Sequence, residues 1–492
     1  MVLLTVDPAS PVPLYRQVVE RVRALVDGGS LAVGHRLPPS RVLAGQLGVN
    51  RSTVLRAYQE LWALGYLEAR PGSYSTIRRR VRVVGETERR AVPLIDWEQA
   101  AAPAARDLAE THRRFARLSE RSGGPDVISF ASLAGDRSLA PVAALRRAVD
   151  RVLREESDAV LDYGSPQGYE PLREAIAVRM RAHGMAVQPA EIMVTNGAQH
   201  GIELVARLFA GPGRSAVIEA PTYSAAVPLL RFAGLELVEV AMRDDGMDLD
   251  ALAEVLRSQR PAFVYTMPTF QNPTGITTSQ THRERLLALC EAHRVPLVED
   301  GFEEELKYFG RAVLPVKSMD HRGVVIYLST FSKVLFPGLR VGWIAAERGC
   351  IERLVALNRF ASLSTTTLGQ AAFARLLHEG RFEAHVRRVH AAYRRRMSAL
   401  LRALEERIPS GVTWTRPEGG YTLWVRLAAP CGDEEALLAA LAEHRVAVAA
   451  GSLFFASTAS ELGFRLSISN LTEADIEEGV ARLGRVLAAV VS

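Results

Sequence analysis

One lysine constrains this chain more than any other residue. The sequence contains 60 Lys and Arg residues in total, and the lysines among them are Lys307, Lys317 and Lys333. Lys333 follows the apolar run 324–328, which predicts a buried strand that ends at a cluster of hydroxyl side chains. Because guanidinium stays protonated, arginine cannot form the Schiff base with an aldehyde that a lysine amine forms. An isolated lysine is more often a solvated surface residue, so its neighbours decide between the two interpretations.

The residues around Lys333 suit a phosphate group. Ser329, Thr330 and Ser332 supply hydroxyl groups, and Arg340 follows a Pro-Gly bend that can bring its guanidinium back toward them. This motif, Ser-Thr-Phe-Ser-Lys followed by Gly-Leu-Arg, resembles the lysine motif that binds pyridoxal phosphate (PLP) in fold-type I aminotransferases. The rest of the chain is then expected to supply the other contacts of the cofactor ring.

Residues 126–492 alternate apolar strands with amphipathic helices. This alternation predicts an α/β fold in which helices cover both faces of a mostly parallel sheet. After one predicted strand, Gly197, Ala198 and Gln199 form a glycine loop at the start of a helix. Free backbone N–H groups and the helix dipole favour an anionic phosphate at such a position.

Three more predicted strands end at side chains that suit a pyridine ring. Tyr223 can stack on a ring face, and the amide of Asn272 can hydrogen-bond a phenolic oxygen. A buried carboxylate at Asp300, beside the ring nitrogen, keeps that nitrogen protonated and lets the ring withdraw electrons. Taken singly, these residues have simpler interpretations as a core aromatic, a turn residue and a helix cap. Their joint occurrence in this order favours the ring contacts.

The whole series resembles fold-type I aminotransferases over essentially all of residues 126–492, including a smaller C-terminal α+β domain. The resemblance implies that Lys333 forms the internal aldimine with PLP and that Lys333 and Asp300 are catalytic residues. It also implies cofactor contacts from Lys333, Asp300, Asn272, Tyr223, Gly197, Ala198, Gln199, Thr330, Ser332 and Arg340, and from Tyr163 to the phosphate of the partner subunit in a homodimer.

Two further residues concern the substrate or effector. Arg465, on the alternating segment 463–469, looks like the arginine that binds an α-carboxylate in that family, and an exposed strand cation is the alternative. The sequence departs from the family at Phe302, shortly after Asp300, where a tyrosine is common. A missing hydroxyl there removes a hydrogen bond to the phenolic oxygen, which is expected to favour the protonated aldimine and to impair turnover.

The first 80 residues carry an excess of positive charge. They contain eleven Arg and five acidic residues, a net charge of +6, so residues 81–492 carry about −1 of the total of +5. Apolar spacing predicts helices at 18–26, 42–47 and 51–64, followed by a hairpin over 66–77. A tight turn separates the second helix from the third, an arrangement that places the third helix in the major groove of DNA.

The start of the third predicted helix carries side chains that can reach base edges and phosphates. The candidates for contact with double-stranded DNA are Asn50, Arg51, Ser52 and Thr53, with Arg56 about a turn further on and Arg41 at the backbone. The residues Leu-Pro-Pro-Ser-Arg, Arg-Ser-Thr-Val and Gly-Tyr-Leu within 37–67 resemble the GntR-type winged-helix DNA-binding domain. The wing keeps Gly72 alone where that family usually has two glycines.

Residues 78–125 lose strand periodicity and are rich in Ala, Arg and Glu. We therefore expect a linker between a DNA-binding domain at 1–77 and a PLP-binding and dimerisation domain at 126–492. A partly helical patch is considered over 108–118, where the arginines suit either a solvated helix or additional phosphate contacts.

Several classes of protein are disfavoured. Cys290, Cys350 and Cys431 are far apart in sequence, which argues against a disulfide framework or a zinc site, so no metal is expected. The N-terminus lacks a signal-peptide pattern and no apolar run reaches membrane-spanning length. We expect a cytoplasmic protein with no membrane partner.

A GntR-like winged helix joined to an aminotransferase-like domain resembles the MocR/GabR group of bacterial regulators. The sequence thus predicts a PLP-dependent transcription factor, a homodimer that binds double-stranded DNA and senses a small amino compound by aldimine exchange at Lys333. One alternative is a working aminotransferase that acts on an α-amino acid and a 2-oxo acid. Another is a DNA-binding repressor whose cofactor fold is inactive.

Overall fold

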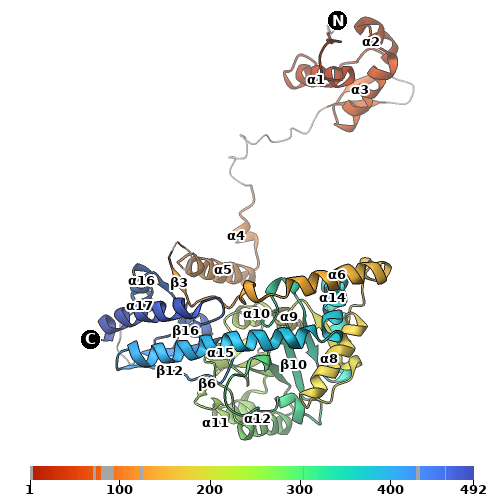
Figure 1. Ribbon diagram of the computed structural model, residues 1–492. Coiled ribbons are helices and arrows are strands. Elements are labelled where there is room, and N and C mark those ends of the chain that lie inside the picture. Colours follow the sequence, from red (N-terminus) through yellow and green to blue (C-terminus); the bar gives the residue numbers. More distant parts are fainter. Residues whose placement is uncertain are drawn as a thin grey trace. The chain divides into compact units, whose positions relative to one another are not determined.

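The computed structural model describes residues 4–69, 74–78, 94–121, 124, 126–302, 304–427, 433–459 and 461–491. The chain forms two compact units, Met1–Asp96 and Trp97–Ser492 (Figure 1). Each unit has its own buried core, as separate domains require.

The first unit is a winged helix. Its elements are α1 (Leu14–Asp27), α2 (Ser40–Leu47), α3 (Arg51–Ala63), β1 (Leu67–Ala69) and β2 (Ser75–Ile77). Gly48 ends α2 with a left-handed φ of 65°, which makes the tight turn into α3. The strands β1 and β2 pair antiparallel, with Leu67 opposite Ile77. The predicted helices and hairpin are confirmed, while the wing tip with Gly72 lies outside the described residues.

The second unit is built on an eight-stranded sheet in the order β4-β11-β10-β9-β8-β5-β6-β7. The strands are β4 (Ile192–Thr195), β5 (Ser215–Ala220), β6 (Glu236–Arg243), β7 (Gly246–Met247), β8 (Phe263–Thr266), β9 (Leu297–Asp300), β10 (Val325–Thr330) and β11 (Gly342–Ala345). From β10 to β6 all neighbours are parallel, and β11 runs antiparallel to both β4 and β10. The predicted mostly parallel sheet is therefore confirmed.

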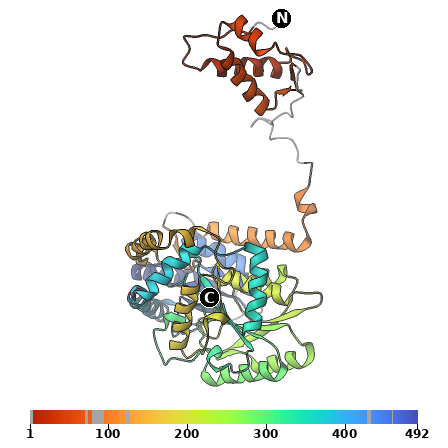
Figure 2. The ribbon, with the colours of Figure 1, turned by 90° about the vertical axis from the view of Figure 1, so that its right-hand side faces the viewer.

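Helices cover both faces of this sheet (Figure 2). Successive strand residues enter different cores, since Val217 packs with the cluster of α11 and α12 whereas Ile218 packs with that of α9, α10 and α13. The helices of this part are α6 (Val142–Glu155), α7 (Ser157–Leu161), α8 (Glu170–Ala182), α9 (Ala198–Phe209), α10 (Ala226–Phe232), α11 (Leu249–Gln259), α12 (Gln280–His293), α13 (Arg348–Ser362) and α14 (Thr367–His378).

A smaller antiparallel sheet, in the order β12-β13-β16-β15, forms the predicted C-terminal α+β part. Its strands are β12 (Val412–Trp414), β13 (Thr422–Leu427), β15 (Ala449–Ala450) and β16 (Gly463–Ser467), and its helices are α15 (Arg381–Arg407), α16 (Glu434–Glu443) and α17 (Glu473–Val491). The helices α15 and α17 lie side by side in Figure 1. Next to this part, β3 (Ile128–Ser129) pairs in parallel with β14 (Val446–Ala447).

Part of the segment 78–125 is helical. The short α4 (Trp97–Ala100) is followed by α5 (Pro103–Arg121), which contains the helical patch expected over 108–118 and belongs to the second compact unit. Arg114 of α5 donates a hydrogen bond from Nη2 to Ser452 Oγ (2.5 Å). Residues 79–93 lie outside the described residues.

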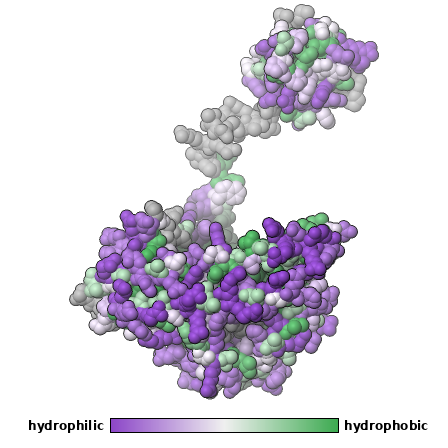
Figure 3. Space-filling view, in the orientation of Figure 1, coloured by the Kyte–Doolittle hydropathy of each residue, from purple (hydrophilic) through white to green (hydrophobic). Residues whose placement is uncertain are grey.

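The visible surface of the second unit is mostly hydrophilic, with separate hydrophobic patches (Figure 3). Among the described residues, no helix has the length and apolar character that crossing a membrane requires.

Candidate cofactor site and DNA-facing surface

A cavity of about 150 Å³ opens at the carboxyl ends of the parallel strands. Strands of one direction end at the same edge of a sheet, so side chains far apart in sequence meet there. The lining residues are Leu133, Ala198, Gln199, Tyr223, Met267, Asn272, Asp300, Phe302, Thr330, Ser332, Lys333, Pro337 and Arg340. The structure thus brings together most of the residues for which the sequence predicted cofactor contacts.

Lys333 lies just beyond β10 and is half-buried. Its Nζ donates a hydrogen bond to the carbonyl oxygen of Leu133 (3.2 Å). Its own carbonyl oxygen accepts a hydrogen bond from Tyr421 Oη (2.5 Å). The amine therefore faces the cavity while the backbone behind it is held by a tyrosine from the smaller sheet.

One end of the cavity is a cradle for an anion. Gly197 has a φ of 83° before α9, which favours glycine, and a Cβ built there would lie 2.8 Å from Arg340 Nη2. Arg340 Nη2 donates to the Asn196 carbonyl (2.5 Å). Thr330 Oγ1 and Ser332 Oγ lie 3.0 Å apart in the same wall. A guanidinium, hydroxyl groups and the N-terminus of α9 together suit a phosphate dianion.

Asp300 ends β9 in the cavity wall and is 2% exposed. Its Oδ2 accepts a hydrogen bond from Tyr265 Oη (2.8 Å), whereas its buried Oδ1 has no hydrogen-bond partner among the described residues. Burial raises the pKa of Asp300 to about 6, although the Tyr265 hydrogen bond and the charge of Lys333 oppose that rise. An unpartnered buried carboxylate oxygen fits a protonated ring nitrogen.

Tyr265 was not predicted as a site residue. It lies on β8, opposite Val298 of the neighbouring strand β9, and period-two alternation places it on the same face of the sheet as Asp300. The alternation could have indicated this position, but a short apolar run such as Phe263–Thr266 predicts only a buried strand in the core.

Arg465 of β16 is 5% exposed, so the alternative of an exposed strand cation is wrong. Its Nη1 donates to Asn272 Oδ1 (3.0 Å) and its Nη2 donates to the Ala131 carbonyl (2.6 Å). Its guanidinium carbon lies 5.1 Å from the centre of the Phe454 ring. Arg465 is outside the lining set itself but contacts it through Asn272.

Three aromatic residues occupy different environments. Tyr223 is half-buried in the wall, and burial raises the pKa of its hydroxyl to about 12. Phe302 is buried and lines the cavity without a hydroxyl group, as its sequence position implies. Tyr163 does not line the cavity of this chain and is 81% exposed.

The chain segment 131–133 contacts Arg465 and Lys333, two of the three cations that the described residues place at the site. The carbonyls of Ala131 and Leu133 accept hydrogen bonds from Arg465 and Lys333 respectively, and that of Ser132 accepts one from Ser469 Oγ (2.8 Å). This segment contributes to the cavity through Leu133. Its backbone carbonyls carry no signal in a sequence pattern, so the sequence analysis missed it.

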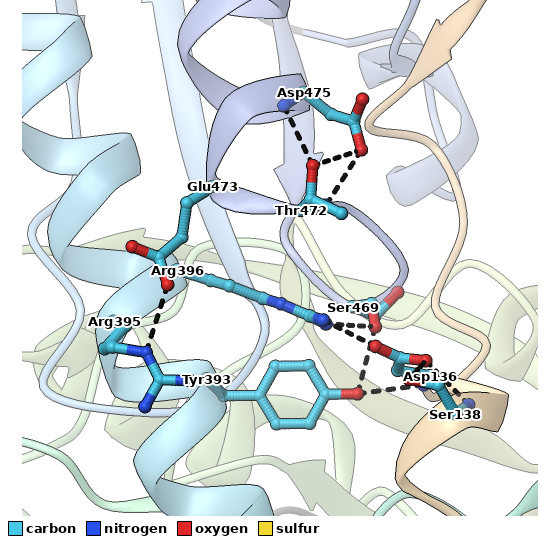
Figure 4. Close-up of polar contacts among 9 residues, drawn as sticks. All are labelled: Asp136, Ser138, Tyr393, Arg395, Arg396, Ser469, Thr472, Glu473 and Asp475. Atoms are coloured by element: carbon cyan, nitrogen blue, oxygen red, sulfur yellow. Dashed lines mark hydrogen bonds and ion pairs between the residues drawn. The ribbon is translucent and has the colours of Figure 1, made fainter.

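Figure 4 shows how the same segment is anchored a few residues later. Tyr393 Oη accepts a hydrogen bond from the Asp136 N–H (2.9 Å) and donates one to the Ser469 carbonyl (2.9 Å). Arg396 forms an ion pair with Asp136, whose side chain also accepts from the Ser138 N–H (2.8 Å). These contacts fix the segment to α15.

In the first unit, the predicted DNA contacts fall into two groups. Arg51 and Ser52 are exposed at the start of α3, and Asn50 caps the helix by accepting from the Ser52 N–H (2.9 Å). Arg41 is exposed on α2 and Thr53 is half-buried. The remaining residue, Arg56, contacts α1.

Arg56 is also exposed, and its guanidinium lies 4.1 Å from the centre of the Tyr15 ring on α1. The exposed face of α3 also presents Leu55 and Trp62, which are 46% and 62% exposed.

Comparison with known proteins agrees with this geometry. The model of the aminotransferase class I and II family matches residues 127–483, and that of the gntR family of bacterial regulatory proteins matches residues 14–77. The chain belongs to the class I and II aminotransferase family and carries a gntR-type DNA-binding domain at its N-terminal end.

Similar proteins include both regulators and enzymes. The chain is 31% identical to the uncharacterized HTH-type transcriptional regulator YdcR of Escherichia coli, over 96% of this chain and 98% of that protein. It is 29% identical to the probable rhizopine catabolism regulatory protein MocR of Rhizobium meliloti, over 88% and 85%. It is 36% identical to aromatic-amino-acid aminotransferase 1 of Thermococcus litoralis, over 81% and 97%.

A solved structure with the same fold is LysN, the α-aminoadipate aminotransferase of Thermus thermophilus, complexed with N-(5'-phosphopyridoxyl)-L-leucine. The match has a TM-score of 0.74 and 35% identity, and it covers 81% of this chain and 99% of LysN. PLP is the cofactor of the second unit, and the anion cradle, the free oxygen of Asp300 and the amine of Lys333 fit its phosphate, ring nitrogen and aldehyde.

Proposed function

We propose that this protein is a DNA-binding transcriptional regulator that senses a small amino compound at Lys333. The observation that carries the proposal is the placement of that amine in a cofactor-shaped cavity on a chain that also contains a winged helix. The similarity to YdcR and MocR, regulators by name, extends over both parts and supports it.

The chain's own residues have defined roles in this proposal. Arg340, Ser332 and the N-terminus of α9 bind the phosphate, and Asp300 holds a proton at the ring nitrogen through its free oxygen. Tyr223 stacks on the ring and Asn272 reaches its phenolic oxygen. Bound PLP supplies an aldehyde carbon that can be held by one amine and passed to another.

An amino acid would compete with a backbone carbonyl for one cation of the site. Its carboxylate binds the guanidinium of Arg465 in place of the Ala131 carbonyl, because a charge-assisted pair is stronger than a bond to a neutral oxygen. Its amine would take the place of Lys333 on the aldehyde, and the released Lys333 amine could then donate to the Leu133 carbonyl, as it does in this structure. The segment would exchange its contact with Arg465 for one with Lys333, while Asp136 stays attached to α15.

This segment leads back toward the DNA-binding unit. The helix α5 ends at Arg121, ten residues before Ala131, and the chain between them includes β3. Binding of an amino compound can therefore bias the position of α5, and through it the DNA-binding units. Such coupling requires that the effector bind one of two conformations more tightly than the other.

We infer a homodimer from an apolar patch on the second unit. Leu161, Tyr163, Phe360 and Leu363 are 73%, 81%, 89% and 55% exposed. The chain around Tyr163 adjoins α13 because Asn358 Nδ2 donates to the Pro166 carbonyl (2.7 Å). A second copy that covers this patch would remove it from water and bring Tyr163 to the partner's phosphate.

A footprinting experiment tests the main proposal. DNA upstream of the protein's own gene and its neighbours is footprinted with the protein alone, with PLP, and with PLP plus a panel of amino acids and amines. We expect a specific footprint whose extent or affinity changes with PLP and with one class of amine. Only salt-labile, non-specific binding that ignores PLP and amines would contradict the proposal.

A working aminotransferase is the second candidate, because Asn272, Asp300, Lys333 and Arg465 all meet at the site. The hydroxyl-free Phe302 in the wall argues against efficient turnover. Turnover with amino acids and 2-oxo acids decides: steady conversion independent of DNA favours the enzyme, and a single slow exchange favours the sensor.

A further inference from the structure

Behind the cavity, a buried carboxylate connects two turns of the cavity wall. Glu219 of β5 is 1% exposed and does not line the cavity. Its Oε1 accepts hydrogen bonds from Thr266 Oγ1 (2.5 Å) and the Met267 N–H (3.1 Å), and its Oε2 accepts from Gln271 Nε2 (3.0 Å). These three donors are neutral and come from β8 and the turn after it, so Glu219 ties β5 to that turn.

The side chain of Gln271 extends the connection. Its Nε2 also donates to the carbonyl of Pro221 (2.7 Å), two residues before Tyr223. Its Oε1 accepts from the N–H and the hydroxyl of Thr274 (2.9 and 2.6 Å). Gln271 is fully buried and directly precedes Asn272. A single amide thus holds the turn that carries Tyr223 and the turn that carries Asn272.

The sheet alone does not fix these turns relative to each other. The strands β5 and β8 pair in parallel, and the last paired residues are Ile218 and Tyr265. Beyond that point β5 stays paired with β6 as far as Ala220 and β8 with β9 as far as Thr266, and each chain then leaves the sheet as a separate turn. The contacts of Gln271 with Glu219 and with the Pro221 carbonyl bridge them, and buried polar groups with satisfied partners fix local geometry strongly.

We propose that Glu219 and Gln271 are positioning residues that fix Tyr223 and Asn272 relative to each other and so determine how the PLP ring is held. The inference rests on the cofactor contacts proposed above for Tyr223 and Asn272. Neither Glu219 nor Gln271 touches the cofactor. They act through the residues that do, because a site needs supporting contacts to hold its geometry.

The variant Glu219→Gln tests this assignment. Its carboxamide keeps the volume, and its oxygen can still accept from Thr266 and Met267, but its NH₂ group meets the NH₂ group of Gln271. The Glu219–Gln271 bond is lost while the core stays filled, and the Gln271–Pro221 bond remains as the weaker connection between the turns. We expect the Kd for PLP, from absorbance titration, to rise about tenfold, and the visible circular dichroism of the bound cofactor to change.

A matched control lies on the next strand but one from β5. Glu299 of β9 is also fully buried, and it accepts from the N–H groups of Val316 (2.8 Å) and Lys317 (2.7 Å), outside the cavity lining. Glu299→Gln is expected to lower the melting temperature without changing PLP affinity or the dichroism. If both variants lose stability alike and both leave PLP affinity and dichroism unchanged, the positioning role is overturned.

A double-mutant cycle gives a second measurement. Gln271→Met removes the same bond from its other end, together with the bonds to Pro221 and Thr274, so the double variant should weaken PLP binding no more than Gln271→Met alone. Additive effects would mean that the two residues act separately, against the proposal. The titration uses PLP and needs neither DNA nor an effector, so failure of the regulatory function would leave this result unaffected.

Discussion

The DNA-facing end of α3 and the cofactor cavity differ in how their polar side chains are positioned. At α3 the candidate contacts are contiguous in sequence, exposed, and held by local hydrogen bonds such as that from Ser52 to Asn50. In the cavity they come from five separate strand ends and are buried or half-buried, apart from Gln199 and Arg340. Substitutions should therefore change affinity gradually on the first surface and disrupt the second, where an unmatched polar group is costly.

Replacing Lys333 by Ala should have the largest effect. The amine is the group that binds the aldehyde covalently, so borohydride reduction followed by mass spectrometry should find no PLP attached to the chain. The response of DNA binding to amines should also disappear, while DNA affinity without effector stays within about twofold. Lys307→Ala is the control, since Lys307 pairs with Glu418 and does not line the cavity. A reducible PLP adduct in the Lys333 variant would refute the assignment.

The substitution Asp300→Asn should come next. It removes the charge that holds a proton on the ring nitrogen, and PLP affinity measured by absorbance titration should fall by about 10–100-fold. Unchanged affinity would show that the free Oδ1 does not face the ring nitrogen.

The same variant makes a prediction for the protein without PLP. Burial raises the pKa of Asp300 from 3.8 to about 6, because the folded protein favours the neutral acid. The free energy of unfolding is therefore highest below pH ~4 and decreases as the pH rises through ~6, where the buried acid ionises. At pH 8 the Asn variant should therefore be more stable than the original protein, by on the order of 2–3 kcal/mol. Denaturant unfolding across this pH range measures the difference, which should vanish near pH 4.

On the DNA-facing surface the effects should be smaller and unequal. Arg51→Ala should weaken specific DNA binding by about 1–3 kcal/mol, because Arg51 is exposed at the start of α3. Arg56→Ala should cost less, because the guanidinium lies on Tyr15. Fluorescence anisotropy at several salt concentrations compares them. Equal losses would mean that Arg56 leaves Tyr15 to contact DNA.

The substitution Phe302→Tyr should have the smallest effect. A hydroxyl added to the cavity wall can donate to the phenolic oxygen of the cofactor and lower the pH midpoint of its absorbance change. A pH titration of the spectrum measures this shift. An unchanged midpoint would mean that the Phe302 ring is directed away from that oxygen.

The sequence by itself determined the parts that depend on short segments. The winged helix was predictable because its caps, turns and apolar spacing lie within a few residues of one another, and the strand-end motifs around Lys333, Asp300 and Asn272 were predictable because each follows its own strand. Their roles were expected from resemblance, and the cavity shows that the residues meet.

Only the tertiary structure decided which groups outside those motifs support the site. Tyr265 beside Asp300, the carbonyls of Ala131 and Leu133, and the Glu219–Gln271 contact all depend on how strands and loops far apart in sequence are brought together. The same holds for Arg56, whose charge predicted a DNA contact but whose guanidinium is directed to another helix. A residue type fixes which bonds a side chain can make, whereas burial and neighbours in space determine which of them form.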